Sequence, residues 1–179
     1  MRLVLAILMV VLVFPAAAQA EMVLHSADIA EGQTVTDAHV FNGFGCEGDN
    51  LSPALHWEAV PEGAKSLALT VYDPDAPTGS GWWHWVAFNI PVDVKSLDAG
   101  ASLKAMPEGV VESRTDYGAV GYGGPCPPQG DQPHRYIFTL HALDVETLDL
   151  GQDTPAAQVG YFLNVHGLAT ASITATYGR

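Results

Sequence analysis

Two acidic residues are interspersed with prolines in the stretch Asp73-Pro74-Asp75-Ala76-Pro77. Each proline fixes its own φ and disfavours the helical region for the residue before it, so both carboxylates are held in an extended or tight-turn geometry. We expect one carboxylate to accept hydrogen bonds from backbone N–H groups of the turn, which is a structural role. The other is expected to face a pocket as an acceptor or base.

Two histidines are the other candidate groups. His84 follows two tryptophans, and His134 opens the run His134-Arg135-Tyr136 after a loop rich in glycine and proline. A single strand histidine is more often a structural residue, but two that begin strands at one end of a sheet would converge with the acids. Two imidazoles and a glycine-rich backbone can donate to a phosphate, sulfate or carboxylate. Arg135 alternates away from His134 and is expected to hold an acid of the 73–77 turn.

The common enzyme templates fit the sequence poorly. Ser80 does not lie in a G-x-S-x-G elbow, and there is no His-x-x-x-His or Cys-x-x-Cys spacing for a metal. The glycines at 121–124 form neither a P-loop nor a dinucleotide fingerprint. We therefore expect no cofactor, no metal and no catalytic residue. The alternative of a metal held by an Asp with His84 and His134 lacks local ligand spacing.

The elements that must position these residues are mostly strands. Alternating apolar residues predict strands over 65–72, 83–90, 135–143 and 169–177, with weaker ones over 22–30, 34–40 and 55–59. Within 83–90, alternation predicts Trp83 and Trp85 on one face. It predicts the other face as His84, Val86, Phe88 and Ile90.

One helix is predicted between Thr154, as its N-cap, and Gly167, as its end, with Pro155 at the first helical position. Its apolar stripe consists of Ala156, Val159 and Leu163. The overall pattern predicts a mainly β fold, an antiparallel β-sandwich with one or two short peripheral helices.

The first twenty residues read as a secretory signal peptide. Arg2 precedes the apolar run 3–14, and Ala18-Gln19-Ala20 is a small-residue cleavage site. The alternative, an anchoring helix, would need a longer apolar run. We expect cleavage after Ala20, one domain over 21–179, a periplasmic or secreted location, and no membrane span once the signal is removed.

Charge and cysteine content limit the partners. Twenty acidic residues against seven basic ones give a net charge of −13, which repels nucleic acid and anionic membrane surfaces. The two cysteines, Cys46 and Cys126, are most simply one disulfide in an exported chain. The alternative is two separate thiols, one of them nucleophilic.

These motifs resemble those of the phosphatidylethanolamine-binding protein family, in particular its bacterial Raf-kinase-inhibitor-like branch. Order and spacing agree over nearly the whole chain after residue 20. The motifs that carry the resemblance are the 73–77 turn, Trp82-Trp83-His84-Trp85, Gly123-Gly124-Pro125 through Pro128, His134-Arg135-Tyr136, the early loop 48–55 and the closing Ala175-Thr176-Tyr177. The resemblance implies a β-sandwich with a small anion pocket at one end.

Carried over by position, the resemblance implies a ligand-binding set of nine residues. Trp82 would sit at the rim, the Ala76–Pro77 bond is a candidate cis peptide, and a Cys46–Cys126 bond would tie the early loop to the pocket loop. The sequence departs from the eukaryotic pattern at Trp83, where that pattern has the first histidine of a pair. The nine residues are Asp73, Asp75, Ala76, Pro77, Trp82, His84, Pro128, His134 and Tyr136.

The leading functional hypothesis is a non-enzymatic exported module that binds a small anionic ligand and modulates a protein partner. His84 and His134 would donate to the anion, with Asp75 orienting one imidazole, so affinity would rise as pH falls through about 6.5. One alternative is an inhibitor of a protease or kinase that acts through surface contact. Another is a weak hydrolase or isomerase that uses the two histidines and Asp75 as acid and base.

Overall fold

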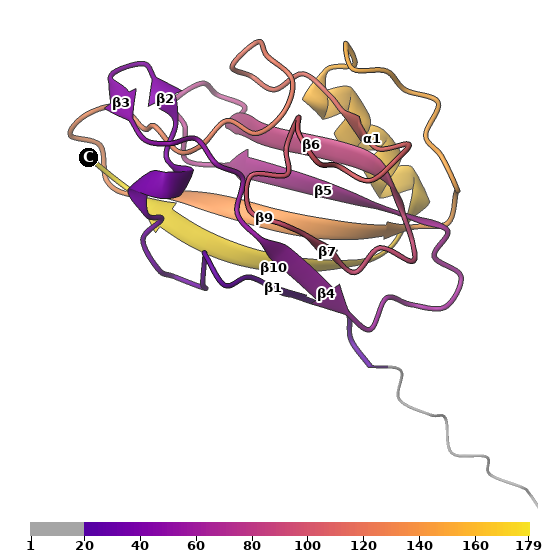
Figure 1. Cartoon of the computed structure of the whole chain (residues 1–179). Coiled ribbons are helices and arrows are strands. Elements are labelled where there is room, and N and C mark those ends of the chain that lie inside the picture. The colour runs from indigo at the N-terminus through magenta and orange to yellow at the C-terminus, as the bar shows by residue number, and fades with distance from the viewer. Residues whose placement is uncertain (1–19) are drawn as a thin grey trace, which may run out of the picture.

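A computed structural model describes residues 20–179, and its main feature is a five-stranded antiparallel sheet with the strand order β10-β9-β5-β6-β8 (Figure 1). All four predicted long strands lie in this sheet, so their prediction is confirmed. The strands are β5 (Ser66–Asp73), β6 (Trp82–Pro91), β8 (Val111–Glu112), β9 (His134–Leu143) and β10 (Gly167–Tyr177).

Smaller elements complete the sandwich. A three-stranded sheet has the order β1-β4-β7, and β2 pairs with β3 in a short hairpin. Their bounds are β1 (Val23–His25), β2 (Asn42–Gly43), β3 (Cys46–Glu47), β4 (Leu55–Glu58) and β7 (Ser96–Leu97). The strand predicted over 34–40 is wrong: Asp37–His39 form a 3-10 helix, and only Thr34 makes an isolated bridge, to Thr176.

The main core lies between the two sheets. Alternate residues of β5 and β9 bury one face, including Leu69 and Phe138, against Trp57 of β4. The opposite face of the large sheet is covered by helix α1 (Ala156–His166), as Figure 1 also shows. Antiparallel strands covered on one side by a sheet and on the other by a helix confirm the predicted sandwich.

The predicted helix is confirmed, with a different start. Pro155 is the N-cap, and no side chain caps the helix, because the Thr154 hydroxyl accepts a hydrogen bond from Gly151 N–H instead. The three residues of the predicted apolar stripe are buried against the large sheet: Ala156, Val159 and Leu163.

Strand β6 contains a bulge near its N-terminal end, at His84. Val71 of β5 pairs with Trp85, and the next residue, Tyr72, pairs with Trp83. His84 is therefore an extra residue on β6 with no counterpart on β5. A bulge of this kind bends the strand and re-aims the extra side chain.

A second irregularity near Asn89, whose φ is 60°, shifts the alternation again. The predicted common face of His84, Val86, Phe88 and Ile90 is therefore wrong. Val86 and Phe88 pack under α1, whereas Ile90 lies in the main core. Trp83 and Trp85 are likewise on opposite sides of the sheet. Trp83 packs on the side covered by α1, and Trp85 lies in the main core.

Within residues 20–179 no helix has the length and apolarity required to cross a membrane. The predicted signal peptide falls almost entirely in residues 1–19, outside the described residues.

Candidate functional site

A cavity of about 200 Å³ lies at the end of the sandwich where β5 ends and where β6 and β9 begin. Eight of the nine residues carried over from the family resemblance line it; Asp75 does not. The lining also contains five residues outside that set. The full lining is Phe44, Asp73, Ala76, Pro77, Thr78, Trp82, His84, Tyr117, Cys126, Pro127, Pro128, His134 and Tyr136.

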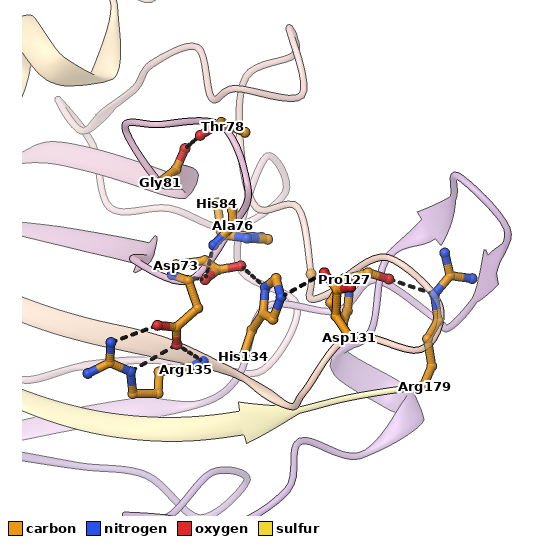
Figure 2. A network of polar contacts seen from close by, with 12 residues as sticks. Asp73, Ala76, Thr78, Gly81, His84, Pro127, Asp131, His134, Arg135 and Arg179 are labelled. Carbon is orange, nitrogen blue, oxygen red and sulfur yellow. Dashed lines mark hydrogen bonds and ion pairs between the residues drawn. The ribbon is translucent and has the colours of Figure 1, made fainter.

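Asp73 organises one wall of this pocket. Its carboxylate is buried, and Oδ1 accepts the backbone N–H groups of Asp75 at 2.8 Å and Ala76 at 3.1 Å. Its Oδ2 accepts from His134 Nδ1 at 2.8 Å, as Figure 2 shows. One carboxylate thus fixes both the 73–77 turn and the orientation of an imidazole.

Asp75 has the other role. Both of its carboxylate oxygens bind the Arg135 guanidinium, at 2.7 and 2.9 Å, and one of them also accepts the Arg135 backbone N–H. Hydrogen bonds from Arg135 lower the pKa of Asp75 to about 2. The prediction that Arg135 holds an acid of the turn is confirmed. The prediction that Asp75 orients an imidazole in the pocket is wrong, because Asp73 does so.

The predicted cis bond between Ala76 and Pro77 is also wrong, because the described residues contain no cis peptide. The turn is held by the side chain of Asp73 together with a backbone hydrogen bond from Thr78 N–H to the Ala76 carbonyl.

His84 reaches the pocket because of the bulge in β6. Its ring is buried, and Nδ1 donates to the Gly123 carbonyl at 2.7 Å. Burial lowers the pKa of His84 to about 4, although the Gly123 carbonyl and the Asp73 carboxylate oppose the shift. His84 is therefore neutral at neutral pH. The expectation that it titrates near pH 6.5 as a charged donor is wrong.

This shift predicts a pH dependence of stability. Because the pKa of His84 is about 4 in the folded chain and about 6.5 when unfolded, the unfolded chain binds more protons between these values. The free energy of unfolding is expected to be highest above pH 6.5 and to fall as pH is lowered towards 4. Burial lowers the pKa of His141 to about 4 as well, so it adds to the slope.

Urea denaturation at several pH values checks this expectation. The variants His84→Gln and His141→Gln should each have a shallower loss of stability between pH 6.5 and 4 than the wild type. A wild-type stability that is unchanged over this interval would contradict the neutral state of both rings.

His134 lies between two carboxylates. Its Nδ1 donates to Asp73, and its Nε2 is 3.5 Å from Oδ2 of Asp131. Figure 2 shows the three side chains in a row, with His134 between the two carboxylates. Among the described residues no group of three or more His, Cys, Asp or Glu side chains is arranged to hold a metal ion.

Aromatic rings form the rim of the pocket. Tyr117 stacks on Phe41 with ring centroids 4.1 Å apart, and it contacts Phe44 and the edge of Trp82. The Tyr117 hydroxyl donates to the Gly124 carbonyl, which fixes the ring beside His84. Phe41, Phe44 and Tyr117 come from loops without periodicity, so the aromatic content of those loops was the only sequence signal for them. Trp82 is the first residue of β6, and its place at the rim was predicted from the family resemblance.

A disulfide and hydrogen bonds tie the rim loops together. The predicted disulfide between Cys46 and Cys126 is present, with an S–S distance of 2.06 Å, and Cys126 lines the pocket. The guanidinium of Arg179 donates to the carbonyls of Pro127 and Gly45 at 2.7 Å and of Phe44 at 3.2 Å. The early loop and the pocket loop are thereby held as one unit.

Two residues of the pocket lining have buried polar hydrogens without an acceptor among the described residues. These are the indole Nε1–H of Trp82 and the hydroxyl of Tyr136. Buried polar groups in native proteins are nearly always paired, so each such group requires an explanation. Both groups belong to residues of the same pocket lining.

Comparison with known proteins agrees with this architecture. The protein YbhB of Escherichia coli is 52% identical over 158 residues, which cover 87% of this chain and 99% of YbhB. YbcL of E. coli is 52% identical over 155 residues, 85% of each chain. The crystal structure of YbcL superposes with a TM-score of 0.88 at 50% identity, covering 89% of this chain and 99% of that one.

A more distant structure shares the fold alone. The carboxypeptidase Y inhibitor, solved in complex with its cognate proteinase, matches at 21% identity with a TM-score of 0.53 over 89% of this chain and 83% of the inhibitor. The sequence model of the phosphatidylethanolamine-binding protein family matches residues 25–178. The chain therefore belongs to the phosphatidylethanolamine-binding protein family.

Proposed function

We propose that this protein is an exported, non-enzymatic binding module whose pocket takes a small oxyanion or the oxyanion head group of a larger ligand. The observation that carries the proposal is the pair of buried, unpaired donors on the pocket lining, Trp82 Nε1–H and Tyr136 O–H. An anionic oxygen satisfies such donors with hydrogen bonds that are stronger than neutral ones.

The surroundings of these donors support a binding role. Tyr136 is fully buried, and burial raises the pKa of its hydroxyl, so the group keeps its proton and remains a donor. His134 lines the pocket and is oriented by Asp73. The family name supports a phosphate-bearing head group as the ligand.

The disulfide supports export, since such bonds persist in oxidising compartments. A mature chain whose measured mass corresponds to a start at Glu21 would agree with export, and an uncleaved chain would contradict it.

The variant Tyr136→Phe tests the binding site. Removing an unpaired buried hydroxyl relieves its desolvation cost, so the ligand-free protein is expected to gain about 1 kcal/mol in free energy of unfolding. Loss of a donor to the bound anion is expected to weaken phosphate binding about tenfold. Urea denaturation measures the first effect, and calorimetric titration with inorganic phosphate at pH 6 measures the second.

Tyr161→Phe is the matched control, because Tyr161 is 64% exposed on α1, which covers the opposite face of the sheet. It should change neither stability nor phosphate binding. No detectable binding of phosphate, phosphoethanolamine or acetate by the wild type would contradict the anion site. The alternative of an inhibitor acting through surface contact would then be favoured.

A further inference from the structure

We propose, resting on the proposed anion site, that the pocket selects ligands that carry an acidic proton on the oxyanion itself. It takes oxyanions that carry one negative charge and at least one acidic O–H, namely dihydrogen phosphate and phosphomonoesters in their monoanionic form. It discriminates against sulfate and phosphodiesters, which have similar acceptor oxygens but no such proton. The juxtaposition that carries this proposal is a fixed hydrogen-bond acceptor, His84 Nε2, in a pocket whose lining contains no Lys or Arg.

The first step concerns the tautomer of His84. A carbonyl oxygen can only accept, so the 2.7 Å contact between His84 Nδ1 and the Gly123 carbonyl requires the proton on Nδ1. No hydrogen bond from Nε2 to the described residues is found, and His84 lines the pocket. Because burial keeps the ring neutral, Nε2 carries a lone pair and can accept a hydrogen bond from the ligand.

The second step concerns charge. None of the thirteen residues that line the pocket is Lys or Arg. The two arginines at this end of the sandwich are engaged elsewhere, Arg135 with Asp75 and Arg179 with three backbone carbonyls. Asp73 already places a carboxylate in the wall. A second negative charge on the ligand would therefore be repelled by Asp73, with no Lys or Arg in the lining to offset the repulsion.

The third step matches donors with acceptors. The unpaired N–H of Trp82 and O–H of Tyr136 require acceptor oxygens, and the Nε2 lone pair of His84 requires a donor. A phosphomonoester monoanion offers both on one phosphorus atom. A sulfate or a phosphodiester would instead place an oxygen lone pair against that of Nε2, which leaves a buried acceptor unpaired.

Calorimetric titration of the wild type at pH 6 with methyl phosphate, dimethyl phosphate and sodium sulfate tests the proposal. Dimethyl phosphate is the matched probe, because it keeps one negative charge and lacks the proton. Methyl phosphate is expected to bind at least about tenfold more tightly than either of the others, the cost of one unpaired buried acceptor. Equal affinities of the three anions would overturn the proposal and leave the anion site standing. Binding of none would remove both.

The pH profile gives a second readout. Phosphomonoesters lose their second proton near pH 6, so the affinity for methyl phosphate should fall about tenfold per pH unit above about 7. An affinity that is flat or rises between pH 6 and 8 would overturn the proposal.

Groups of the protein that face His84 could also titrate: Asp73 from β5, His134 and Tyr136 from β9, and Asp116 and Tyr117 from the rim loop. Burial raises the pKa of both tyrosines, which keeps them uncharged over this range. Dimethyl phosphate does not titrate there, so the ratio of the two affinities isolates the proton of the ligand.

The variant His84→Gln reverses the preference, since a side-chain amide can turn its N–H₂ group towards the ligand. Dimethyl phosphate is expected to gain affinity relative to methyl phosphate by about tenfold. An unchanged ratio in a folded variant would overturn the role of Nε2, and the wild-type comparison stands by itself if the variant does not fold. Competition by vesicles that contain phosphatidic acid, itself a phosphomonoester, distinguishes a lipid source from a free phosphate.

Discussion

Replacement of Asp73 by alanine is expected to lower the free energy of unfolding by about 3 kcal/mol, because it leaves the buried His134 ring and two backbone N–H groups without their hydrogen-bond acceptor. The side chains of Asp73 and His134 are only 4% and 5% exposed. The same change removes the acceptor for the Asp75 and Ala76 N–H groups, so the 73–77 turn loses its anchor. Binding of phosphate should be lost with it, because His134 is no longer oriented.

Urea denaturation and calorimetric titration measure the two effects. The matched control is Asp75→Ala, two residues away in the same turn. Its ion pair with Arg135 is far more exposed, with side-chain exposures of 31% and 55%, so the expected loss is below about 1 kcal/mol. If the two alanine variants were equally stable, Asp73 would not hold the turn. If Asp73→Ala still bound phosphate like the wild type, orientation of His134 would not matter for binding.

The second large effect is expected from the disulfide. The double variant Cys46→Ser, Cys126→Ser is expected to lose about 4 kcal/mol of stability in the chain-entropy model, because the bond closes a long loop. The two cysteines are 80 residues apart in sequence. Phosphate affinity should fall too, since Cys126 lines the pocket and the bond holds the loop of Phe44 against it.

Reduction provides the control for this double variant. A strong reductant should lower the stability and phosphate affinity of the wild type to those of the variant, and it should leave the variant unchanged. A variant that kept wild-type affinity while losing stability would show that Arg179 alone fixes the rim.

Much of the fold could be predicted because the strands of the large sheet obey a simple period. In β9, Tyr136, Phe138 and Leu140 face the core at every second residue, and β5 does the same with Leu67 and Leu69. Such alternation is a direct consequence of strand geometry. Short pairings such as β2 with β3 have no period to detect, since they span two residues each.

The family resemblance predicted which residues line the pocket, but not which of their side chains are hydrogen-bonded to one another. Asp73 and Asp75 are equivalent in sequence, and their roles are separated only by the partners that β9 presents. His134 points inwards and takes Asp73, whereas Arg135 points outwards and takes Asp75. The choice of partners depends on how β9 is placed against the 73–77 turn, which the local sequence alone does not determine.

His84 illustrates a different limit. Simple alternation placed it on the face of Val86 and Phe88, but a bulge puts one extra residue into β6 and turns the imidazole into the pocket. A bulge leaves no mark on the hydrophobic period until the neighbouring strand is known. The burial that follows lowers the pKa of the ring and so changes its chemistry from charged donor to neutral acceptor.

Cys126 belongs both to the disulfide and to the pocket wall. The reduction of the disulfide and the binding of ligand in the pocket are therefore two coupled equilibria. Coupling between equilibria is reciprocal. If breaking the cross-link weakens the hold on the ligand, then an occupied pocket must make the cross-link harder to reduce by the same factor. The reduction potential of the cysteine pair would thus depend on the ligand concentration. Without ligand, the disulfide would be reduced by reductants that do not reduce it in the ligand-bound protein.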